Sequence, residues 1–172
     1  MPTSMRTVHL LRHAKSSWED QGLADHDRPL APRGIRAATR MREHLREEGI
    51  RPDLVLCSTA VRASQTLELV RPALTGARVE IEPALYAASA HAILDRLRAL
   101  AEPVRSVMVV AHNPGLQDVA VHLAGRGERL DELVGKYPTC ALATLVFPND
   151  PWSSIDEGDG ELAGYTIPRE LD

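Results

Sequence analysis

The sequence predicts an α/β fold, a three-layer αβα sandwich around a largely parallel central sheet. Short apolar runs bounded by polar turns, typical of strands, alternate with longer segments whose apolar residues recur at helical spacing. This alternation favours a sheet covered by helices on both faces and joined by right-handed crossovers. The 172 residues contain no internal repeat and suit one domain, predicted over 1–172.

The strands are predicted at the apolar runs. In chain order these runs are 7–11, 53–57, 79–81, 106–111 and 141–147, with a short final strand near 163–167. Residues 149–160 are rich in Pro, Ser, Asp and Gly, so we expect a mobile loop before the last strand.

The helices are predicted from four apolar stripes between these runs. Pro32 suits a first helical turn, whereas Gly49 and Gly125 suit helix ends. The stripes are Ile35, Ala38, Met41 and Leu45; Ala60, Ala63, Leu67 and Val70; Ile93, Leu94, Leu97 and Leu100; and Leu116, Val119, Ala120 and Leu123.

Composition and charge exclude several classes of protein. A net charge of -4 gives no overall electrostatic reason to bind nucleic acid or acidic membranes, so a phosphorylated ligand must be held by locally gathered arginines. Two cysteines are too few for a disulfide scaffold, and no apolar stretch reaches the ~18 residues of a membrane span. The N-terminus lacks the apolar segment of a secretion signal. We therefore expect a cytoplasmic protein with neither nucleic-acid nor membrane partners.

Polar residues gather where three predicted strands end. Arg12 and His13 follow the first, Ser58 and Arg62 the second, and His112 the fourth. Carboxyl ends of parallel strands share one edge of a sheet, which is where α/β proteins bind ligands. Two histidines and two arginines there suit a phosphoryl group with negative equatorial oxygens. We assign the nucleophile to His13, because a neutral imidazole attacks near pH 7 without a metal.

Four ordered blocks resemble the histidine phosphatase superfamily, also called the phosphoglycerate mutase-like family. The first resembles the family's Arg-His-Gly hallmark, with Ala in place of Gly. The resemblance spans nearly the whole chain. The blocks are Arg12-His13-Ala14, Ser16-x-Trp18, Asp27-Arg28-Pro29-Leu30-Ala31-Pro32-Arg33-Gly34 and Ser58-x-x-x-Arg62-Ala63-x-Gln65-Thr66.

The resemblance implies a phosphoglycerate mutase-like fold and roles for individual residues. His13 is expected to become phosphorylated, water then resolves the intermediate, and no metal or cofactor takes part. The phosphoryl oxygens are expected to be held by Arg12, Arg62 and His112. Lys15 and Ser16 are expected to line the entrance and contact the substrate.

One departure from the family pattern bears on the substrate. Many members carry an acidic proton donor after the third strand, and Ala87 occupies that position here. An alkoxide leaving group needs such an acid, whereas a phosphoramidate nitrogen can arrive protonated. The sequence therefore resembles the small SixA-like phosphohistidine phosphatases, with a phosphorylated protein or small molecule as substrate. Glu82, Asp20, Asp25 and Asp27 remain candidates for a replacement acid, and Glu19 stands where mutases often have Asn.

Four alternatives stay open at this point. The chain could be a phosphomonoesterase acting on a small metabolite, or a phospho-ligand module without turnover. Cys57 and Arg62 loosely resemble the loop of cysteine phosphatases, although the spacing is one residue short and glycine is missing. A metal site built from His9, His13 and His112 lacks a recognisable ligand pattern.

Overall fold

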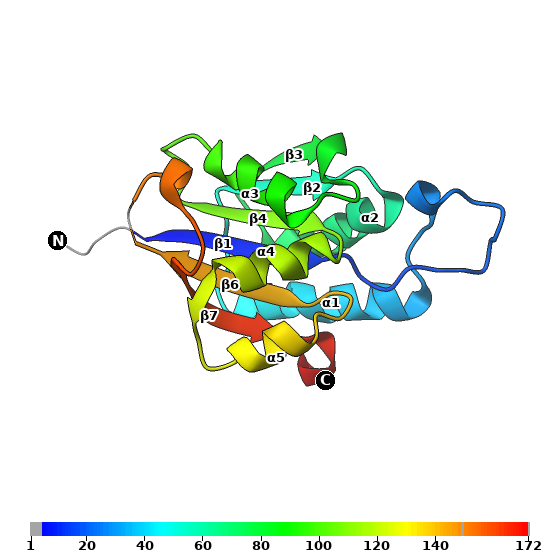
Figure 1. Cartoon of the computed structure of the whole chain (residues 1–172). Helices are drawn as coiled ribbons and strands as arrows, with labels where there is room; N and C mark the ends of the chain where they lie inside the picture. The colour runs from blue at the N-terminus through cyan, green and yellow to red at the C-terminus, as the bar shows by residue number, and fades with distance from the viewer. Residues whose placement is uncertain (1–4, 149, 172) are drawn as a thin grey trace.

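Figure 1 shows the computed structural model, which describes residues 5–148 and 150–171. Its strands are β1 Arg6–Arg12, β2 Leu54–Ser58, β3 Arg78–Glu82, β4 Ser106–Ala111, β5 Ala124–Arg126, β6 Leu142–Phe147 and β7 Gly160–Thr166. Its α-helices are α1 Pro32–Glu47, α2 Val61–Val70, α3 Ala90–Arg98, α4 Gly115–Leu123 and α5 Leu130–Gly135. Short 3-10 turns are η1 Asp25–Asp27, η2 Arg71–Ala73, η3 Pro83–Leu85, η4 Trp152–Ser154 and η5 Pro168–Leu171. No helix in this part of the chain is long and apolar enough to cross a membrane.

The strands form one seven-stranded sheet in the order β3-β2-β4-β1-β6-β7-β5. β4 pairs in parallel with both β1 and β2, and β3 continues the parallel array beyond β2. β6 runs antiparallel to β1 and β7, so it alone is reversed among the described strands. The predicted largely parallel sheet is confirmed, and β1, β2 and β4 end at one edge.

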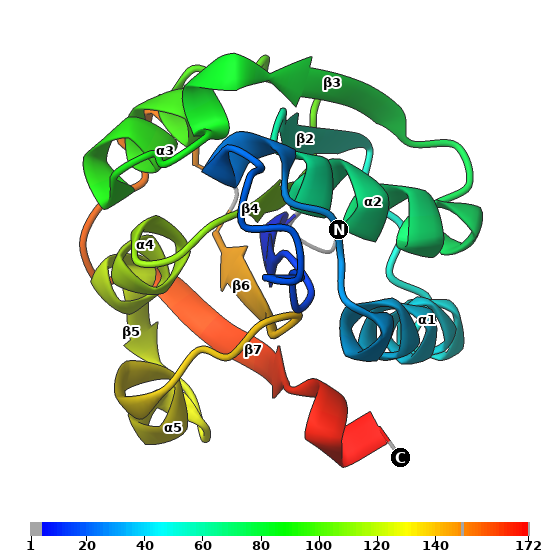
Figure 2. The same ribbon diagram turned by 90° about the vertical axis from the view of Figure 1, so that its right-hand side faces the viewer.

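Helices cover both faces of this sheet. Figure 2 looks onto the carboxyl ends of the parallel strands, with α1 and α2 on one side and α3, α4 and α5 on the other. The core accordingly divides into two clusters of buried side chains. Leu10 faces the first cluster and Leu11 the second, because successive side chains of a strand point to opposite faces. The predicted three-layer sandwich is therefore present.

One short strand and one short α-helix were not predicted. The helical stripe ending at Leu123 suggests a helix end at Gly125, but the chain passes directly from α4 into β5. A Cβ at Gly125 would lie 2.1 Å from the carbonyl oxygen of Gly158, so glycine allows two backbones to approach closely. α5 has six residues, too few to produce a recognisable helical period.

The buried face of α1 is shifted relative to the predicted stripe. Ile35 is 45% exposed, whereas Ala38, Met41 and Leu45 are buried as expected. Gly34 and Ala37 complete the buried face, because the close approach of Gly34 to the backbone of Lys15 sets the rotation of the helix. Including Ile35 in the apolar stripe was therefore wrong.

The segment predicted to be mobile contains buried anchors. Trp152 and Ile155 pack into the cluster under α3 and α4, and the Trp152 indole N–H donates to the Val104 carbonyl at 2.8 Å. Position 149 lies outside the described residues. The mobility of 149–160 stays a prediction, whereas the final strand is confirmed as β7.

Candidate active site

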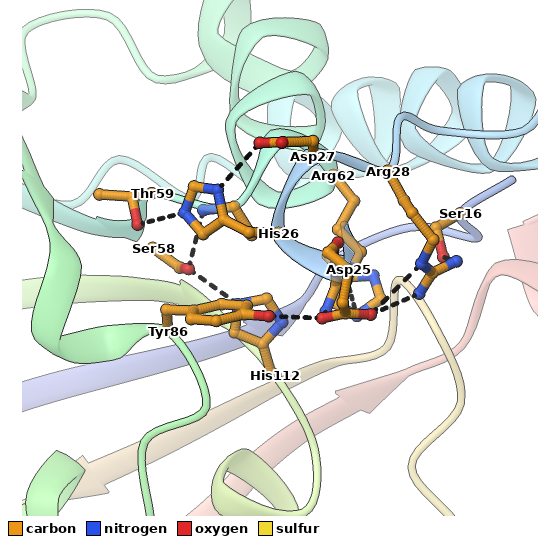
Figure 3. A network of polar contacts seen from close by, with 12 residues as sticks. Ser16, Asp25, His26, Asp27, Arg28, Ser58, Thr59, Arg62, Tyr86 and His112 are labelled. Atoms are coloured by element: carbon orange, nitrogen blue, oxygen red, sulfur yellow. Dashed lines mark hydrogen bonds and ion pairs between the residues drawn. The ribbon is translucent and has the colours of Figure 1, made fainter. Parts of the chain in front are cut away.

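Residues at the ends of β1, β2 and β4 meet in one buried cluster of side chains, here called the pocket. His13 directly follows β1, Ser58 ends β2, and His112 directly follows β4. The rings of His13 and His112 lie 5.2 Å apart between centroids, and each is less than a tenth exposed. Arg62, in the first turn of α2, reaches the same point, as Figure 3 shows. The convergence expected from the parallel topology is thus observed.

The hydrogen bonds of His13 fix which nitrogen can react. Its Nδ1 lies 2.7 Å from the carbonyl oxygen of Ala14, which can only accept, so the ring proton is assigned to Nδ1. Nε2 then keeps its lone pair and faces Nε of Arg62 at 3.4 Å. Burial lowers the pKa of His13 to about 3, and the charges of neighbouring Arg62 and Arg12 act in the same direction. His13 is therefore a neutral imidazole whose Nε2 is unprotonated and accepts a hydrogen bond from Arg62.

His112 is held in the complementary tautomer. The hydroxyl oxygen of Ser58 accepts from the backbone N–H of Ala60, and its own proton is available to Nε2 of His112 at 2.7 Å. The proton of His112 is thereby assigned to Nδ1, which is buried and has no partner among the described residues. Burial, with Arg62, lowers the pKa of His112 to about 4. His112 thus offers an unpartnered N–H donor beside a nucleophile.

Two arginines supply the positive charge. Nη1 of Arg12 donates to the Tyr137 carbonyl at 2.9 Å, while its Nε is buried without a partner in the described part of the chain. Burial, reinforced by Arg62, lowers the pKa of Arg12. Arg62 is 7% exposed and donates from Nη1 to the backbone oxygen of Asp25 at 2.7 Å. Both guanidinium groups are consequently fixed by backbone carbonyls before any ligand binds.

Asp25 is the one candidate acid that contacts these residues. Its Oδ2 accepts from Arg62 Nη2 at 3.0 Å and from the Tyr86 hydroxyl at 2.6 Å, as Figure 3 shows. Arg28 donates to Oδ1. The hydrogen bond from Tyr86, followed by those from the arginines, holds the pKa of Asp25 well below its usual range. Asp25 is accordingly a carboxylate at neutral pH.

The other three candidate acids form their contacts with residues outside this group. Glu82 pairs with Arg96 at 2.8 Å, Asp20 accepts from the backbone N–H of Gly22, and Asp27 lies 3.4 Å from the ring of His26. Ala87 occupies the position of the family acid and has a φ of 56°. Glu19 is exposed.

Other residues of the sequence motifs fix the backbone around the pocket. The Thr66 hydroxyl accepts from the N–H of Ala14 at 2.9 Å and donates to the carbonyl of Arg62 at 2.7 Å, which ties the loop after β1 to α2. Gln65 accepts from the N–H of Leu30. A Cβ on Gly34 would lie 2.1 Å from the carbonyl oxygen of Lys15. These residues therefore fix the position of His13 relative to Arg62.

Comparison with known proteins gives the same family. Residues 8–90 match the profile described as the Histidine phosphatase superfamily (branch 1). An uncharacterized protein of Mycobacterium tuberculosis strain H37Rv is 38% identical over 168 residues, covering 92% of this chain and 100% of that protein. The chain belongs to the histidine phosphatase superfamily.

Solved structures narrow the likeness to one branch of histidine phosphatases. A Nakamurella multipartitia structure, provisionally assigned as the phosphohistidine phosphatase SixA, matches with a TM-score of 0.83 and 30% identity, covering 98% of this chain and 99% of that one. The protein histidine phosphatase SixA complexed with tungstate matches with a TM-score of 0.75 and 26% identity, covering 96% and 99%. This histidine phosphatase is therefore SixA-like, and the predicted phosphoglycerate mutase-like fold is confirmed.

The two entrance residues of this histidine phosphatase differ in placement. Ser16 is 7% exposed, and its hydroxyl accepts from Arg28 at 2.8 Å, so the side chain stabilises the loop. Lys15 is exposed and lines a separate cleft beside the pocket. Contact of either residue with substrate stays a prediction, and the arrangement favours Lys15.

The cysteine and metal alternatives lack support in the geometry of this histidine phosphatase. Cys57 is fully buried under α2, and burial raises the pKa of its thiol to about 12, so a thiolate is disfavoured. His9 bonds the Thr144 hydroxyl at 2.9 Å on β6, away from the other two histidines. The described residues contain no group of three or more His, Cys, Asp or Glu that could hold a metal.

Sequence reasoning missed two aromatic residues at the pocket. Tyr86 bonds Asp25 and lies edge-on to His112, with ring centroids 5.5 Å apart. His26 lies edge-on to Tyr86 at 4.8 Å and bonds the Thr59 hydroxyl at 2.8 Å. Tyr86 could have been found from the sequence, because it immediately precedes Ala87 in a turn that follows a strand of the parallel array.

Proposed function

We propose that this protein is a phosphatase that hydrolyses phosphohistidine through a phosphorylated His13. The tautomer of His13 carries the proposal. Its Nδ1–H is bound to the Ala14 carbonyl, and its Nε2 is unprotonated and faces Arg62. A nitrogen nucleophile held neutral beside two cations and an N–H donor suits attack on a phosphoryl group.

The first step transfers the phosphoryl group to His13. The lone pair on Nε2 attacks phosphorus, and the phosphorus–nitrogen bond of the substrate breaks. The substrate imidazole, which already carries a proton on its other nitrogen, leaves neutral. Arg12, Arg62 and the Nδ1–H of His112 stabilise the charge on the equatorial oxygens.

The second step returns the enzyme to its resting state. A water oxygen attacks the phosphorus of phosphorylated His13, and the phosphorus–Nε2 bond breaks. The water protons stay with the phosphate, and His13 regains its lone pair with the proton still on Nδ1. Apart from substrate and water, every group with a role in the cycle belongs to this protein, so we propose that turnover needs no metal or cofactor.

The state of Asp25 supports phosphohistidine as the substrate. Tyr86, Arg62 and Arg28 all donate to this carboxyl and keep it ionised, so it has no proton to give a leaving alkoxide. Ala87 supplies no acid from the position that other family members use. A leaving imidazole needs no added proton, and the SixA names of the structural relatives agree with this substrate.

One observation favours a second candidate, a phosphomonoesterase acting on a small metabolite. Asp25 is a carboxyl in direct contact with Arg62, and protonation on substrate binding would make it a general acid. A panel of phosphoramidates and phosphomonoesters distinguishes the two: we expect phosphoramidates to be preferred at least ~10²-fold. An equal or reversed preference would favour the phosphomonoesterase.

The intermediate provides the decisive test. Rapid quenching with a radiolabelled phosphohistidine donor should leave label on the wild type and on Cys57→Ser, but not on His13→Asn. Asparagine keeps a donor near the Ala14 carbonyl but lacks the nucleophilic nitrogen, so turnover should fall ~10⁴-fold or more. Label that persists in His13→Asn and disappears in Cys57→Ser would overturn the mechanism. Full activity in excess chelator is expected, and activity restored only by added zinc would contradict it.

A further inference from the structure

A strongly basic cleft of about 560 Å³ lies next to the catalytic pocket. Its walls come from α1, the segment 136–139 and the C-terminal turn η5. Both lysines of the chain, Lys15 and Lys136, line it. Four arginines join them, and none of the described lining residues is acidic. The lining is Lys15, Arg33, Arg36, Ala37, Arg40, Lys136, Pro138, Thr139, Ile167, Pro168 and Arg169.

The cations of the cleft differ from the arginines elsewhere on the surface. Most of those arginines are paired with carboxylates: Arg42 and Arg46 with Glu43, Arg96 with Glu82, Arg98 with Asp156, Arg126 with Glu161 and Arg129 with Glu132. Lys15, Arg33, Arg36 and Lys136 are exposed and form no ion pair with any described residue. A protein of net charge -4 therefore leaves like charges gathered at one place, which suits an anionic ligand.

Backbone contacts join the cleft to the catalytic pocket. Lys15 lies two residues after His13, and Tyr137, between Lys136 and Pro138, accepts the hydrogen bond of Arg12 at 2.9 Å. The N–H of Cys140, next to Thr139, donates to the carbonyl of His13 at 2.9 Å. Figure 2 shows α1 and the C-terminal segment near each other at the same edge of the sheet. The cleft is thus connected directly to the backbone segments that position Arg12 and His13.

We propose that the basic cleft binds an acidic segment of the polypeptide that carries the phosphohistidine. The proposal rests on the proposed function, because it names the substrate as an acidic protein. A phosphate group would fill only part of a space this large. Ala37, Pro138 and Ile167 add apolar contact area between the cations, which suits a peptide backbone with carboxylate side chains. Exposed charges of this kind accelerate association and select the partner.

Peptide binding tests the proposal without requiring turnover. Two labelled peptides of equal length carry the same non-hydrolysable phosphohistidine analogue, flanked either by Asp and Glu or by Ser and Gly. Fluorescence anisotropy should give a Kd about ten-fold lower for the acidic peptide, and this preference should shrink as salt rises from about 0.05 to 0.3 M. Equal affinities for the two peptides would overturn the proposal.

Charge reversal assigns the preference to the cleft. In Arg33→Glu/Arg36→Glu the ratio of the two affinities should fall to about one. These residues are exposed near the start of α1, where glutamate is a good helix former, so folding should be retained. The matched control Arg78→Glu/Arg126→Glu changes the net charge equally at exposed sites on β3 and β5. An equal loss in both variants would mean a general charge effect and would contradict the proposal.

The two proposals can fail separately. If the wild type prefers the acidic peptide but forms no labelled His13 with a phosphohistidine donor, the cleft binds acidic chains and the proposed chemistry is wrong. If the wild type forms labelled His13 and binds both peptides equally, the chemistry stands and the docking proposal is wrong.

Discussion

The catalytic pocket and the basic cleft use cations in opposite ways. Arg62 is buried, and each of its three nitrogens has a defined partner in His13 or Asp25. Arg33 and Arg36, on α1, are exposed and form no ion pair with a described residue. The pocket therefore depends on the geometry of the guanidinium group, whereas the cleft depends on the presence of charge. A substitution that keeps the positive charge but changes the geometry of the cation should therefore impair the pocket and leave the cleft nearly unaffected.

Arg62→Lys should have the largest effect, because it keeps the charge and removes the geometry. One ammonium group cannot reach His13 together with the backbone oxygen and Oδ2 of Asp25, so we expect kcat/KM to fall about 10²-fold on every phosphorylated substrate. Steady-state kinetics with free phosphohistidine measures this. Arg71→Lys, a conservative change at an exposed arginine after α2, is the control and should retain wild-type rates. A loss below about three-fold in Arg62→Lys would mean that charge alone suffices in the pocket.

Asp25→Asn should have a smaller effect. Asparagine can still accept from Arg62, so orientation of the guanidinium is partly kept, and we expect less than a ten-fold loss with phosphohistidine. Loss of a general acid would cost ~10²–10⁴-fold on a phosphomonoester. Comparing the variant on the two substrate classes therefore shows whether Asp25 donates a proton. A loss above 10²-fold with phosphohistidine would contradict the assignment of Asp25 as a supporting carboxylate.

Arg36→Lys should change acidic-peptide binding by less than about two-fold, because an exposed ammonium provides the same charge as a guanidinium. Anisotropy with the acidic and neutral peptides is the measurement. A ten-fold loss of the preference for the acidic peptide would show that binding in the cleft also depends on the geometry of the guanidinium group. The contrast between the two sites would then be wrong.

Lowering the pH from 7 to 5 should leave His13 and His112 neutral. Their pKa values are lowered to about 3 and 4, so protonation begins below this window, whereas an ordinary histidine of pKa near 6.5 would be almost fully protonated at pH 5. NMR of the imidazole C–H signals should show no titration of these two rings above pH 5. Free histidine in the same buffer, which titrates near pH 6.5, serves as the control. Titration of His13 near pH 6.5 would mean a hydrated pocket.

The same pKa values make the fold less stable in acid. The unfolded chain binds protons at His9, His13 and His112 near pH 6.5, whereas the folded chain does not until about pH 3 to 4. Stability is therefore fully present above pH 6.5 and decreases as pH falls through this window. Thermal unfolding between pH 7 and pH 5 measures the decrease, and an unchanged Tm would contradict the burial of these rings.

The sequence predicted most of the fold and the center of the site. Strand ends pointed to His13, Arg62 and His112, because parallel topology alone brings such positions together. Ser16 follows the motif equally well, yet its side chain points inward to Arg28, since loop conformation has no readable period. Tyr86 and Asp25 come from separate loops and meet only in the folded chain. β5 and α5 were missed because a few residues define no period.

The placement of Lys15 and Lys136 has a practical consequence. They are the only side-chain amines of the 172 residues, and both line the basic cleft. If an amine-reactive cross-linker joins a partner to a lysine side chain of this protein, the partner must therefore lie at this cleft. Acylation of the same two amines would remove two of the charges that surround it, so a single chemical modification would both map the partner and weaken its attachment.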